Sequence, residues 1–408
     1  MEQTTTSIPR AERAMERLDL LARVGSDGQN GGITRPGLSV LEDEAHALVA
    51  AWCEEDGMAV SRDSAGNLYG RPAGAPAAGE VWSGSHVDTV PSGGRFDGAL
   101  GVVAAIEAVA AVADDAPGAP LAVVVFRDEE GWRFGEGCFG SRSVAGQVGP
   151  VGLARTDAAG VTIEAALAAL GLPGPPVDVT LPAAYVEVHI EQGPALDAAG
   201  FALADVTAIA GMAGFNVTFR GASGHAGTVP MADRSDAFAA CADLAVRLRE
   251  RALEVPGAVA TIGDVAIAQP AANVIPGVVR ATVDVRAPSA AALDLLVAAV
   301  PAVAAEVATR NRCGVDAVRA WRSEPVSLSP RVRAAVQSAA RSAGVPVAEM
   351  ASGAGHDAGI LAAAGVDAGM LFVRSLNGGV SHRPDELSSE ADIAAAIAVL
   401  TGTLRSLL

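Results

Sequence analysis

The stretch Val81-Trp-Ser-Gly-Ser-His86-Val-Asp88-Thr-Val-Pro-Ser-Gly-Gly-Arg-Phe-Asp97-Gly98 carries the signal that decides the fold. Residues 81–86 predict a buried strand that runs into a glycine-rich loop, so the imidazole of His86 is expected at a carboxyl end of an α/β sheet, where ligands gather. Asp88 follows two positions later on the same side of an extended chain and can accept the second N–H of the imidazole. Asp97 offers two carboxylate oxygens that can bridge two cations. The stretch therefore predicts half of a two-metal hydrolase site.

A second strand supplies the other half about thirty residues later. Residues 121–126, Leu-Ala-Val-Val-Val-Phe, form an apolar, β-branched run typical of an interior strand of a parallel sheet. The run ends in Arg127-Asp-Glu129-Glu130-Gly, and adjacent glutamates at a strand end point in different directions. We interpret Glu130 as a metal ligand and Glu129 as a general base. An acidic pair of this kind is more often a solvated loop, so it indicates chemistry only together with the first stretch.

Histidines are rare in the chain, and five of the six lie in glycine-rich or strand-end contexts. His189 closes the predicted strand 185–190 and precedes Glu-Gln192-Gly-Pro, while His382 follows another apolar strand; both positions suit metal ligands. His46 lies within an amphipathic helical pattern, and we expect it on the helix surface.

Several motifs together resemble one known family. Beyond the stretches already quoted, they are His189-Ile-Glu-Gln-Gly-Pro194, Gly224-His-Ala-Gly-Thr-Val-Pro-Met231, Ser381-His-Arg-Pro-Asp-Glu386, Gly31-Gly-Ile-Thr-Arg35 and Asp63-Ser-Ala-Gly-Asn-Leu-Tyr-Gly70. The chain resembles, over nearly its whole length, the N-carbamoyl-L-amino acid amidohydrolase and allantoate amidohydrolase group of the M20 metallopeptidase superfamily.

The resemblance implies a role for individual residues. It implies that His86 and His189 hold one divalent ion, that Glu130 and His382 hold a second, that Asp97 bridges them, and that Glu129 is the catalytic base. The peptidases of the superfamily typically carry Asp or Glu where this chain has His189, so the resemblance favours amidohydrolase over peptidase activity. A neutral imidazole there leaves the centre more cationic, which lowers the pKa of water between the ions. Zn²⁺, Mn²⁺ and Co²⁺ all suit this mixture of imidazole and carboxylate.

Further positions are implied as contacts to substrate. They are Gln192, His225, Asn273, Arg286, Gly355 and His356. Arg286 would grip a carboxylate in bidentate fashion, and His225 would stabilise the oxyanion, although a plain turn histidine and a solvated strand arginine are the ordinary alternatives.

The implied reaction is hydrolysis of a ureido group. An N-carbamoyl-L-amino acid would yield the L-amino acid, carbon dioxide and ammonia. Allantoate is the alternative substrate and N-carbamoyl-β-alanine the third. A non-catalytic binder of the same fold remains an outside alternative, but its signature, a lost ligand, is absent from the implied set.

Composition limits the partners. The formal net charge is −18, and all 29 basic residues are arginine, so we expect no binding to nucleic acid or to anionic membranes. The polar start of the chain lacks an apolar signal core, and Glu107 interrupts the apolar segment 100–113, so neither export nor a membrane span is expected. The four scattered cysteines indicate no disulfide framework and fit a reducing cytoplasm.

The order of predicted elements indicates an α/β fold with two domains. Residues 1–212 and 327–408 are expected to form a zinc-peptidase-like, doubly wound mixed sheet that holds the bimetallic site. Residues 213–326 are expected to be inserted as a smaller α+β domain with a β-α-β-β-α, ferredoxin-like order. Its helices are predicted at about 233–254 and 290–310. The resemblance implies that this insertion serves as lid and as the interface of a homodimer.

Overall fold

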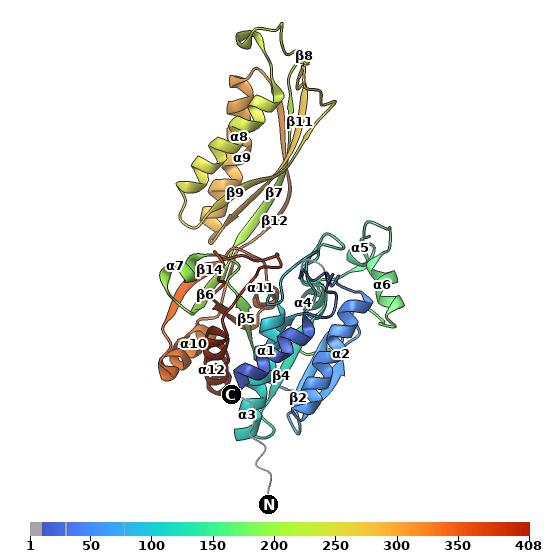
Figure 1. The fold of residues 1–408 in the computed structure, drawn as a ribbon, viewed down its shortest axis with the longest axis vertical. Coiled ribbons are helices and arrows are strands. Elements are labelled where there is room, and N and C mark those ends of the chain that lie inside the picture. Colours follow the sequence, from blue (N-terminus) through green and yellow to red (C-terminus); the bar gives the residue numbers. More distant parts are fainter. Residues whose placement is uncertain (1–9, 29–30, 77) are drawn as a thin grey trace, which may run out of the picture. The chain divides into compact units, whose positions relative to one another are not determined.

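The computed structural model describes residues 10–28, 31–76 and 78–408, which form two compact units. The larger unit comprises residues up to Thr207, Leu328–Met350 and His356–Leu408, and the smaller unit comprises Ala208–Ser327 and Ala351–Gly355 (Figure 1). The polar segment 1–9, on which the expectation about export depends, lies outside the described residues.

A mixed sheet forms the centre of the larger unit. Within the described residues it has nine strands: β1 (Met58–Arg62), β2 (Leu68–Pro72), β3 (Val81–His86), β4 (Leu121–Phe126), β5 (Ala184–Ile190), β6 (Leu203–Ile209), β13 (Val326–Ser327), β14 (Val347–Ser352) and β15 (Asp367–Val373). The strand β13 and the last two residues of β6 and of β14 fall within the residues of the smaller unit. The strand order is β1-β2-β4-β3-β5-β15-β6-β13, with β14 paired to β6. The four central strands β4, β3, β5 and β15 run parallel, whereas the pairs β1–β2, β2–β4, β15–β6 and β6–β13 are antiparallel. The fold class is therefore mixed α/β, and the predicted bounds of β3 and β4 are confirmed.

Helices cover both faces of this sheet. They are α1 (Arg10–Leu21), α2 (Val40–Glu55), α3 (Ala99–Asp115), α4 (Phe139–Val144), α5 (Pro150–Leu153), α6 (Ile163–Ala169), α7 (Ala195–Ala199), α10 (Pro330–Ala343), α11 (Asp357–Ala363) and α12 (Glu390–Leu407). Every residue of β5 is buried. Its Ala184, Val186 and Val188 join the main core with α1, α3 and α12, whereas the intervening residues, among them His189, face the side on which α4 and α11 pack.

The smaller unit is a four-stranded antiparallel sheet with two helices. Its strand order is β12-β7-β11-β9. The elements are β7 (Gly211–Arg220), β8 (Gly224–His225), the 3₁₀ helix η1 (Met231–Asp233), α8 (Ala237–Leu253), β9 (Val259–Ile267), β10 (Val274–Ile275), β11 (Val278–Ala287), α9 (Ala290–Arg310) and β12 (Gly314–Ser323). Phe215, Val217 and Phe219 of β7 alternate into a core shared with α8 and α9. The strand β12 was not predicted from the sequence.

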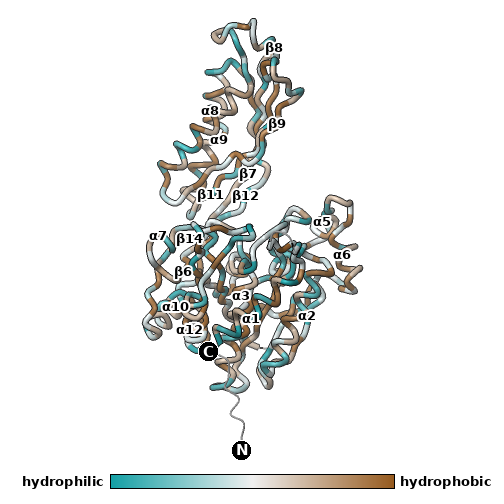
Figure 2. The backbone as a smooth tube through the Cα atoms, in the orientation of Figure 1, coloured by the Kyte–Doolittle hydropathy of each residue, from teal (hydrophilic) through white to brown (hydrophobic). Residues whose placement is uncertain are grey.

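Helix α9 passes a test of length and hydropathy for a membrane span. Its mean hydropathy is 1.9, and 33% of its apolar window is buried. In Figure 2, α8 carries both hydrophobic and hydrophilic residues, whereas α9 is predominantly hydrophobic. Buried residues such as Leu293, Leu296 and Val300 of α9 lie in the core of the smaller unit, which accounts for part of this hydropathy.

His46 was predicted to lie on a helix surface, and this prediction is wrong. It lies on α2 and is fully buried, and neither ring nitrogen has a hydrogen-bond partner. Burial, followed by the nearby Arg127 and Arg62, lowers its pKa well below the usual histidine value. The helical pattern was read correctly, but the broad apolar face of α2 includes the histidine.

Candidate metal centre

The four parallel strands deliver the candidate ligands to one edge of the sheet. β3 and β5 pair in register, with Gly84 opposite Glu187, so His86 and His189 occupy equivalent positions two residues further on. Phe126, the last residue of β4, pairs with His86, and the acidic residues follow directly. β15 ends at Val373 and leads into the loop that carries His382. This arrangement explains why residues far apart in the sequence meet at the carboxyl ends of the strands.

Two groups of possible metal ligands share Asp97. One consists of His86, Asp97 and His189, and the other of Asp97, Glu130 and His382; in each, the ligand atoms lie within 4.8 Å of one another. Asp97 Oδ1 is 3.7 Å from His86 Nε2 and 3.2 Å from His189 Nε2. Asp97 Oδ2 is 3.4 Å from His382 Nε2, which is 3.5 Å from Glu130 Oε2. One oxygen of Asp97 thus faces each group.

The two histidines of the first group have the tautomer that a cation site requires. The Nδ1 atoms of His86 and His189 lie 3.2 and 2.9 Å from the backbone carbonyls of Asp88 and Ile190, so each carries the proton and donates it there. Both Nε2 atoms are buried and have no hydrogen-bond partner. Glu130 Oε1 is likewise buried without a partner. Buried acceptors left without donors fit a site for divalent cations.

Glycine at position 98 gives Asp97 and His86 their close approach. Gly98 has a φ of +63° and directly precedes α3. A Cβ atom at this position would lie 2.4 Å from the imidazole of His86. Only glycine suits both the left-handed backbone and the contact.

The ionisable groups of the cluster shift one another's pKa in both directions. Although burial would raise the pKa of Asp97, the imidazoles of His189, His86 and His382 lower it far below its usual range. Burial lowers the pKa of His86, but Glu129 and Asp88 reverse this and raise it well above the usual value. For Glu130, burial and then the charge of Asp97 raise the pKa. These shifts show that the carboxylates and imidazoles of the cluster interact strongly with one another.

Glu129 lies beside the first ligand group. Its Oε2 is 3.6 Å from His86 Nε2, and its Oε1 lies 3.7 Å from the Cys138 thiol, which donates to it. Burial, offset in part by His86, raises its pKa well above the usual carboxyl value. Glu129 and Glu130 thus face different neighbours, as their adjacency predicted. Asp128, which precedes them in the turn after β4, adopts a left-handed φ of +48°.

Asp88 has a different principal contact from the one expected. Its Oδ1 lies 3.4 Å from His86 Nδ1, while its two oxygens accept the backbone N–H groups of Glu129 at 3.0 Å and Glu130 at 3.1 Å. The carboxylate therefore joins the loop after β3 to the acidic residues after β4. The backbone carbonyl of Asp88 is the nearer acceptor for the imidazole.

The structure also places the residues expected to contact substrate. Gln192, with a φ of +58°, donates from Nε2 to Asp97 Oδ2 at 2.8 Å. His356 is buried, and the centroid of its ring lies 4.5 Å from that of the His189 ring. Burial, followed by the neighbouring His189, lowers the pKa of His356 well below the usual value. Gly355 precedes it in the sequence and belongs to the smaller unit.

In the smaller unit, two of the residues expected to contact substrate, His225 and Asn273, lie on neighbouring segments. His225 on β8 pairs with Val274 on β10, and the backbone carbonyl of Asn273 accepts the N–H of Ala226 at 2.9 Å. Arg286 on β11 lies apart from that turn, donating to Asp284 at 2.8 Å and to the carbonyl of Gly353 at 2.9 Å. The two contacts of Arg286 were not anticipated.

Two residues of the centre were missed. Ser381 donates to Asp97 Oδ2 at 2.8 Å, and Glu386 Oε1 accepts the N–H groups of Phe96 at 2.7 Å and Asp97 at 2.9 Å. Burial, followed by the charge of Asp97, raises the pKa of Glu386 to about 7. Both residues belong to the motif around His382, and their closeness in sequence to that histidine is the signal that could have identified them.

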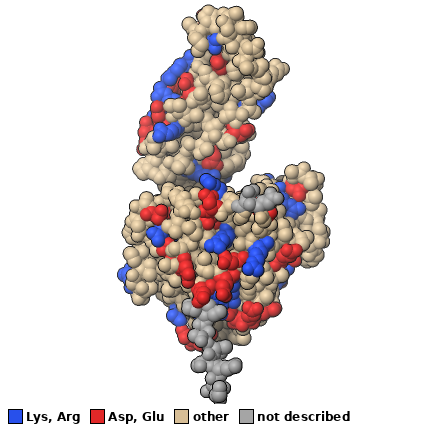
Figure 3. Space-filling view, in the orientation of Figure 1, with Lys and Arg blue, Asp and Glu red and all other residues tan. Residues whose placement is uncertain are grey.

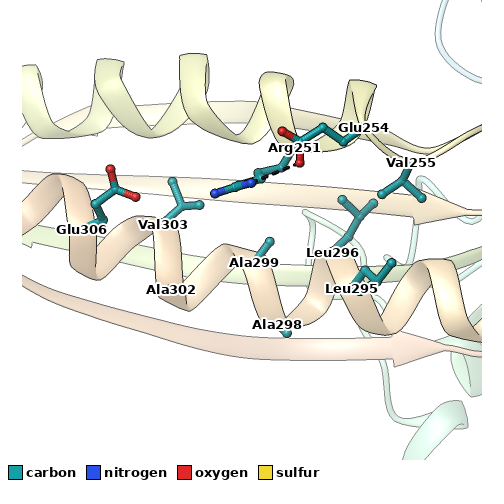
Figure 4. A pocket seen from close by; sticks show the side chains of 10 residues that line it. All are labelled: Arg251, Glu254, Val255, Leu295, Leu296, Ala298, Ala299, Ala302, Val303 and Glu306. Carbon is teal, nitrogen blue, oxygen red and sulfur yellow. Dashed lines mark hydrogen bonds and ion pairs between the residues drawn. The ribbon is translucent and has the colours of Figure 1, made fainter.

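An apolar hollow lies elsewhere, between α8 and α9 of the smaller unit (Figure 4). Its volume is about 510 Å³, and leucine, valine and alanine side chains line it beside the Arg251–Glu254 ion pair of 3.1 Å. No metal-ligand group of the described residues lies there.

On the molecular face in Figure 3, acidic and basic side chains are interspersed.

Comparison with known proteins gives concordant matches. The model of peptidase family M20/M25/M40 matches residues 82–406. An N-carbamoyl-L-amino acid amidohydrolase of Geobacillus stearothermophilus is 38% identical, over 96% of this chain and 97% of that protein. A probable allantoate deiminase of Oryza sativa subsp. japonica is 34% identical, over 93% of this chain and 85% of that protein. A crystal structure of a hydantoinase/carbamoylase family amidase from Burkholderia multivorans has a TM-score of 0.91 at 33% identity and covers 97% of both chains.

Proposed function

The chain belongs to peptidase family M20/M25/M40 and is an amidohydrolase of that family, and from this premise we propose that its substrate is an N-carbamoyl-L-amino acid. It would cleave the carbamoyl C–N bond and release the L-amino acid, carbon dioxide and ammonia. The observation that carries the proposal is the pair of ligand groups sharing Asp97, with Glu129 beside them.

We further propose two divalent ions, Zn²⁺, Mn²⁺ or Co²⁺, as the cofactors. His86 and His189 would hold one, Glu130 and His382 the other, and Asp97 both. When bound, the ions supply positive charge that polarises the ureido carbonyl and makes water more acidic. The unpartnered Nε2 atoms of His86 and His189 fit this assignment.

Side chains of the protein would carry out proton transfer, substrate binding and stabilisation of the oxyanion. Glu129 takes the proton of the attacking water and passes it to the leaving nitrogen. Arg286 binds the α-carboxylate of the substrate, and Gln192, Asn273, Gly355 and His356 orient the remainder. His225 donates to the oxygen that becomes negative during attack. Asp88 holds the backbone of Glu129 and Glu130 in place.

Allantoate is the second candidate substrate, and several relatives favour it. Four allantoate deiminases of plants are 32–34% identical to this chain. Allantoate carries two ureido groups on one carboxylate, so the same ion centre and the same arginine could serve it. N-carbamoyl-β-alanine is the third candidate.

A kinetic comparison of these three substrates tests the proposal. The protein is stripped of metal, reconstituted with each ion in turn, and assayed for ammonia release, with Glu129→Gln as the control that assigns activity to this centre. The highest kcat/KM is expected for N-carbamoyl-L-amino acids. Preference for allantoate would select the second candidate. Tight binding without turnover in the metal-loaded protein would indicate a non-catalytic binder.

We also propose a cytoplasmic homodimer, in which the smaller unit acts as lid and His225 enters the partner subunit's site. His225→Ala and Glu129→Gln would each be nearly inactive as homodimers. Mixing them under subunit exchange is expected to restore activity, because one of the two sites in each heterodimer then has both wild-type residues. Absence of recovery despite demonstrated exchange would contradict the shared site.

A further inference from the structure

The acidic turn, defined here as residues 127–130, is held by side chains from outside the metal cluster. It begins where β4 ends, so its backbone N–H groups leave the sheet and need other partners. Four consecutive N–H groups each donate to a side-chain oxygen. Arg127 donates to Asn67 Oδ1 at 3.1 Å, Asp128 to Glu42 Oε1 at 2.9 Å, and Glu129 and Glu130 to the oxygens of Asp88.

The carbonyl groups of the same turn are fixed as well. Those of residues 127, 128 and 129 accept the N–H groups of Gly140 at 2.8 Å, Phe139 at 3.0 Å and Cys138 at 2.8 Å. Asp128 is left-handed, and its side chain fills the space beside Gly37, where a Cβ atom would lie 1.9 Å from Asp128 Oδ1. The turn therefore has little freedom to rotate the side chains of Glu129 and Glu130.

Glu42 is a buried acceptor that contacts this turn. Its side chain, on α2, is 0% exposed. Besides the N–H of Asp128, it accepts from the guanidinium of Arg127 at 3.0 Å and from the N–H of Leu38 at 2.7 Å. A buried carboxylate with three donors is strongly oriented.

Asn67 is also held by hydrogen bonds. Its Nδ2 donates to Asp63 Oδ2 at 2.7 Å and to the carbonyl of Gly140 at 3.2 Å. Asp63 is fixed in turn by the hydroxyl of Tyr69 at 2.9 Å. The motif Asp63–Gly70, which had no role in the site, thus forms a support for the Arg127 backbone.

We propose that Glu42 and Asn67 are positioning residues for catalysis. By accepting the N–H groups of Asp128 and Arg127, they set the direction in which the turn presents Glu129 and Glu130. Neither touches the metal cluster, so their effect should fall on turnover and on the ion held by Glu130, and little on substrate binding. This inference rests on the proposed two-ion function.

Variants at these two positions test it. Glu42→Leu and Asn67→Leu keep side-chain size but remove the acceptor, whereas Glu42→Gln keeps one acceptor oxygen. Glu107→Gln is the matched control, because Glu107 is also 0% exposed among arginines, 2.8 Å from Arg13 Nε and 2.7 Å from Arg17 NH1, but contacts no part of the turn.

Two readouts are needed: steady-state kinetics, and direct titration of metal-free protein with Zn²⁺. For Glu42→Leu and Asn67→Leu, we expect kcat to fall by about 10- to 100-fold and the affinity for one of the two ions to fall by a similar factor, as for other residues that orient ligands. KM and the affinity for the other ion should stay within about threefold of wild type. Glu42→Gln should recover part of both losses. Glu107→Gln should change thermal stability alone.

The outcomes separate the two claims. If the wild-type protein binds fewer than two ions or hydrolyses no ureido acid, the proposed function fails. If the wild-type protein meets both conditions while Glu42→Leu and Asn67→Leu keep its kcat and both ion affinities, or lose them no more than Glu107→Gln does, the positioning role is overturned. A variant that does not fold leaves the decision to the other position and to Glu42→Gln.

Discussion

The two units differ in how they hold their candidate residues. In the larger unit, His86, Asp97 and His189 are buried, and the ends of β3 and β5 together with the loop before α3 bring their possible ligand atoms within 4.8 Å of one another. In the smaller unit, His225 is exposed and Arg286 and Asn273 are partly or fully exposed, with no comparable cluster among its described residues. Groups that bind ions or move protons require fixed geometry, whereas groups that bind a substrate can be ordered by it. Variants in the ion cluster of the larger unit should therefore affect ion binding and turnover, whereas a variant of Arg286, the proposed carboxylate-binding residue of the smaller unit, should affect KM.

The largest effect is expected for the shared carboxylate. Asp97→Asn keeps the shape of the side chain but removes the charge that both ligand groups use. Activity should fall by roughly 10³-fold or more, because each ion contributes several kcal/mol of stabilisation to the transition state. Elemental analysis should show that the binding of both ions is weakened. Loss of a single ion would mean that Asp97 belongs to one half only.

Glu129→Gln should lower activity less than Asp97→Asn does, and it should leave the ions bound. We expect both ions and substrate binding to persist while kcat falls on the order of 10²-fold or more, as removal of a general base does. Rapid-mixing kinetics and metal analysis on the same sample distinguish this from ligand loss. Wild-type turnover in this variant would assign the base to another residue.

Arg286→Ala tests the smaller unit. If Arg286 binds the substrate carboxylate, KM should rise about 10- to 100-fold, in line with about 1.5–3 kcal/mol for a charged hydrogen bond, with kcat less affected. Asp284→Asn is the control, because it removes the ion-pair partner at 2.8 Å but leaves the guanidinium in place. Its KM should stay equal or fall. An equal rise in both variants would indicate a structural role for the pair.

The sequence predicted the centre better than its surroundings. Apolar runs with abrupt ends located β3, β4 and β5, and His86, Glu130 and His189, three of the candidate ligands, lie at or just after the carboxyl ends of these strands. Hydrogen bonds from backbone N–H groups to side chains leave no pattern in the sequence, so Glu386 and the support of the acidic turn were missed. The hydroxyl contact of Ser381 with Asp97 depends on tertiary placement and was missed as well. β12 escaped prediction because its exposed residues, among them Arg319 and Trp321, mask the alternation. Helix α8 begins later than expected because Asp236 caps it.

The smallest expected effect concerns packing in the larger unit. His46 is buried with its pKa lowered, whereas in the unfolded chain it binds a proton below about pH 6.5. The unfolded state then binds more protons, so this contribution to stability is present above about pH 6.5 and is lost as the pH falls. His46→Leu should remove up to about 1.4 kcal/mol per pH unit of this dependence. Denaturant unfolding of metal-free protein between about pH 5 and pH 8 measures it, and parallel curves for variant and wild type would contradict a buried neutral histidine.

The most direct test of the account is a metal titration of the wild-type protein. Metal-free protein is titrated with Zn²⁺ or Mn²⁺ while bound ion and the rate of N-carbamoyl-L-amino acid hydrolysis are measured in the same samples. The two ligand groups that share Asp97 predict saturation at two ions per chain, with full activity only when both are bound. Full activity at one tightly bound ion per chain would contradict the bimetallic centre.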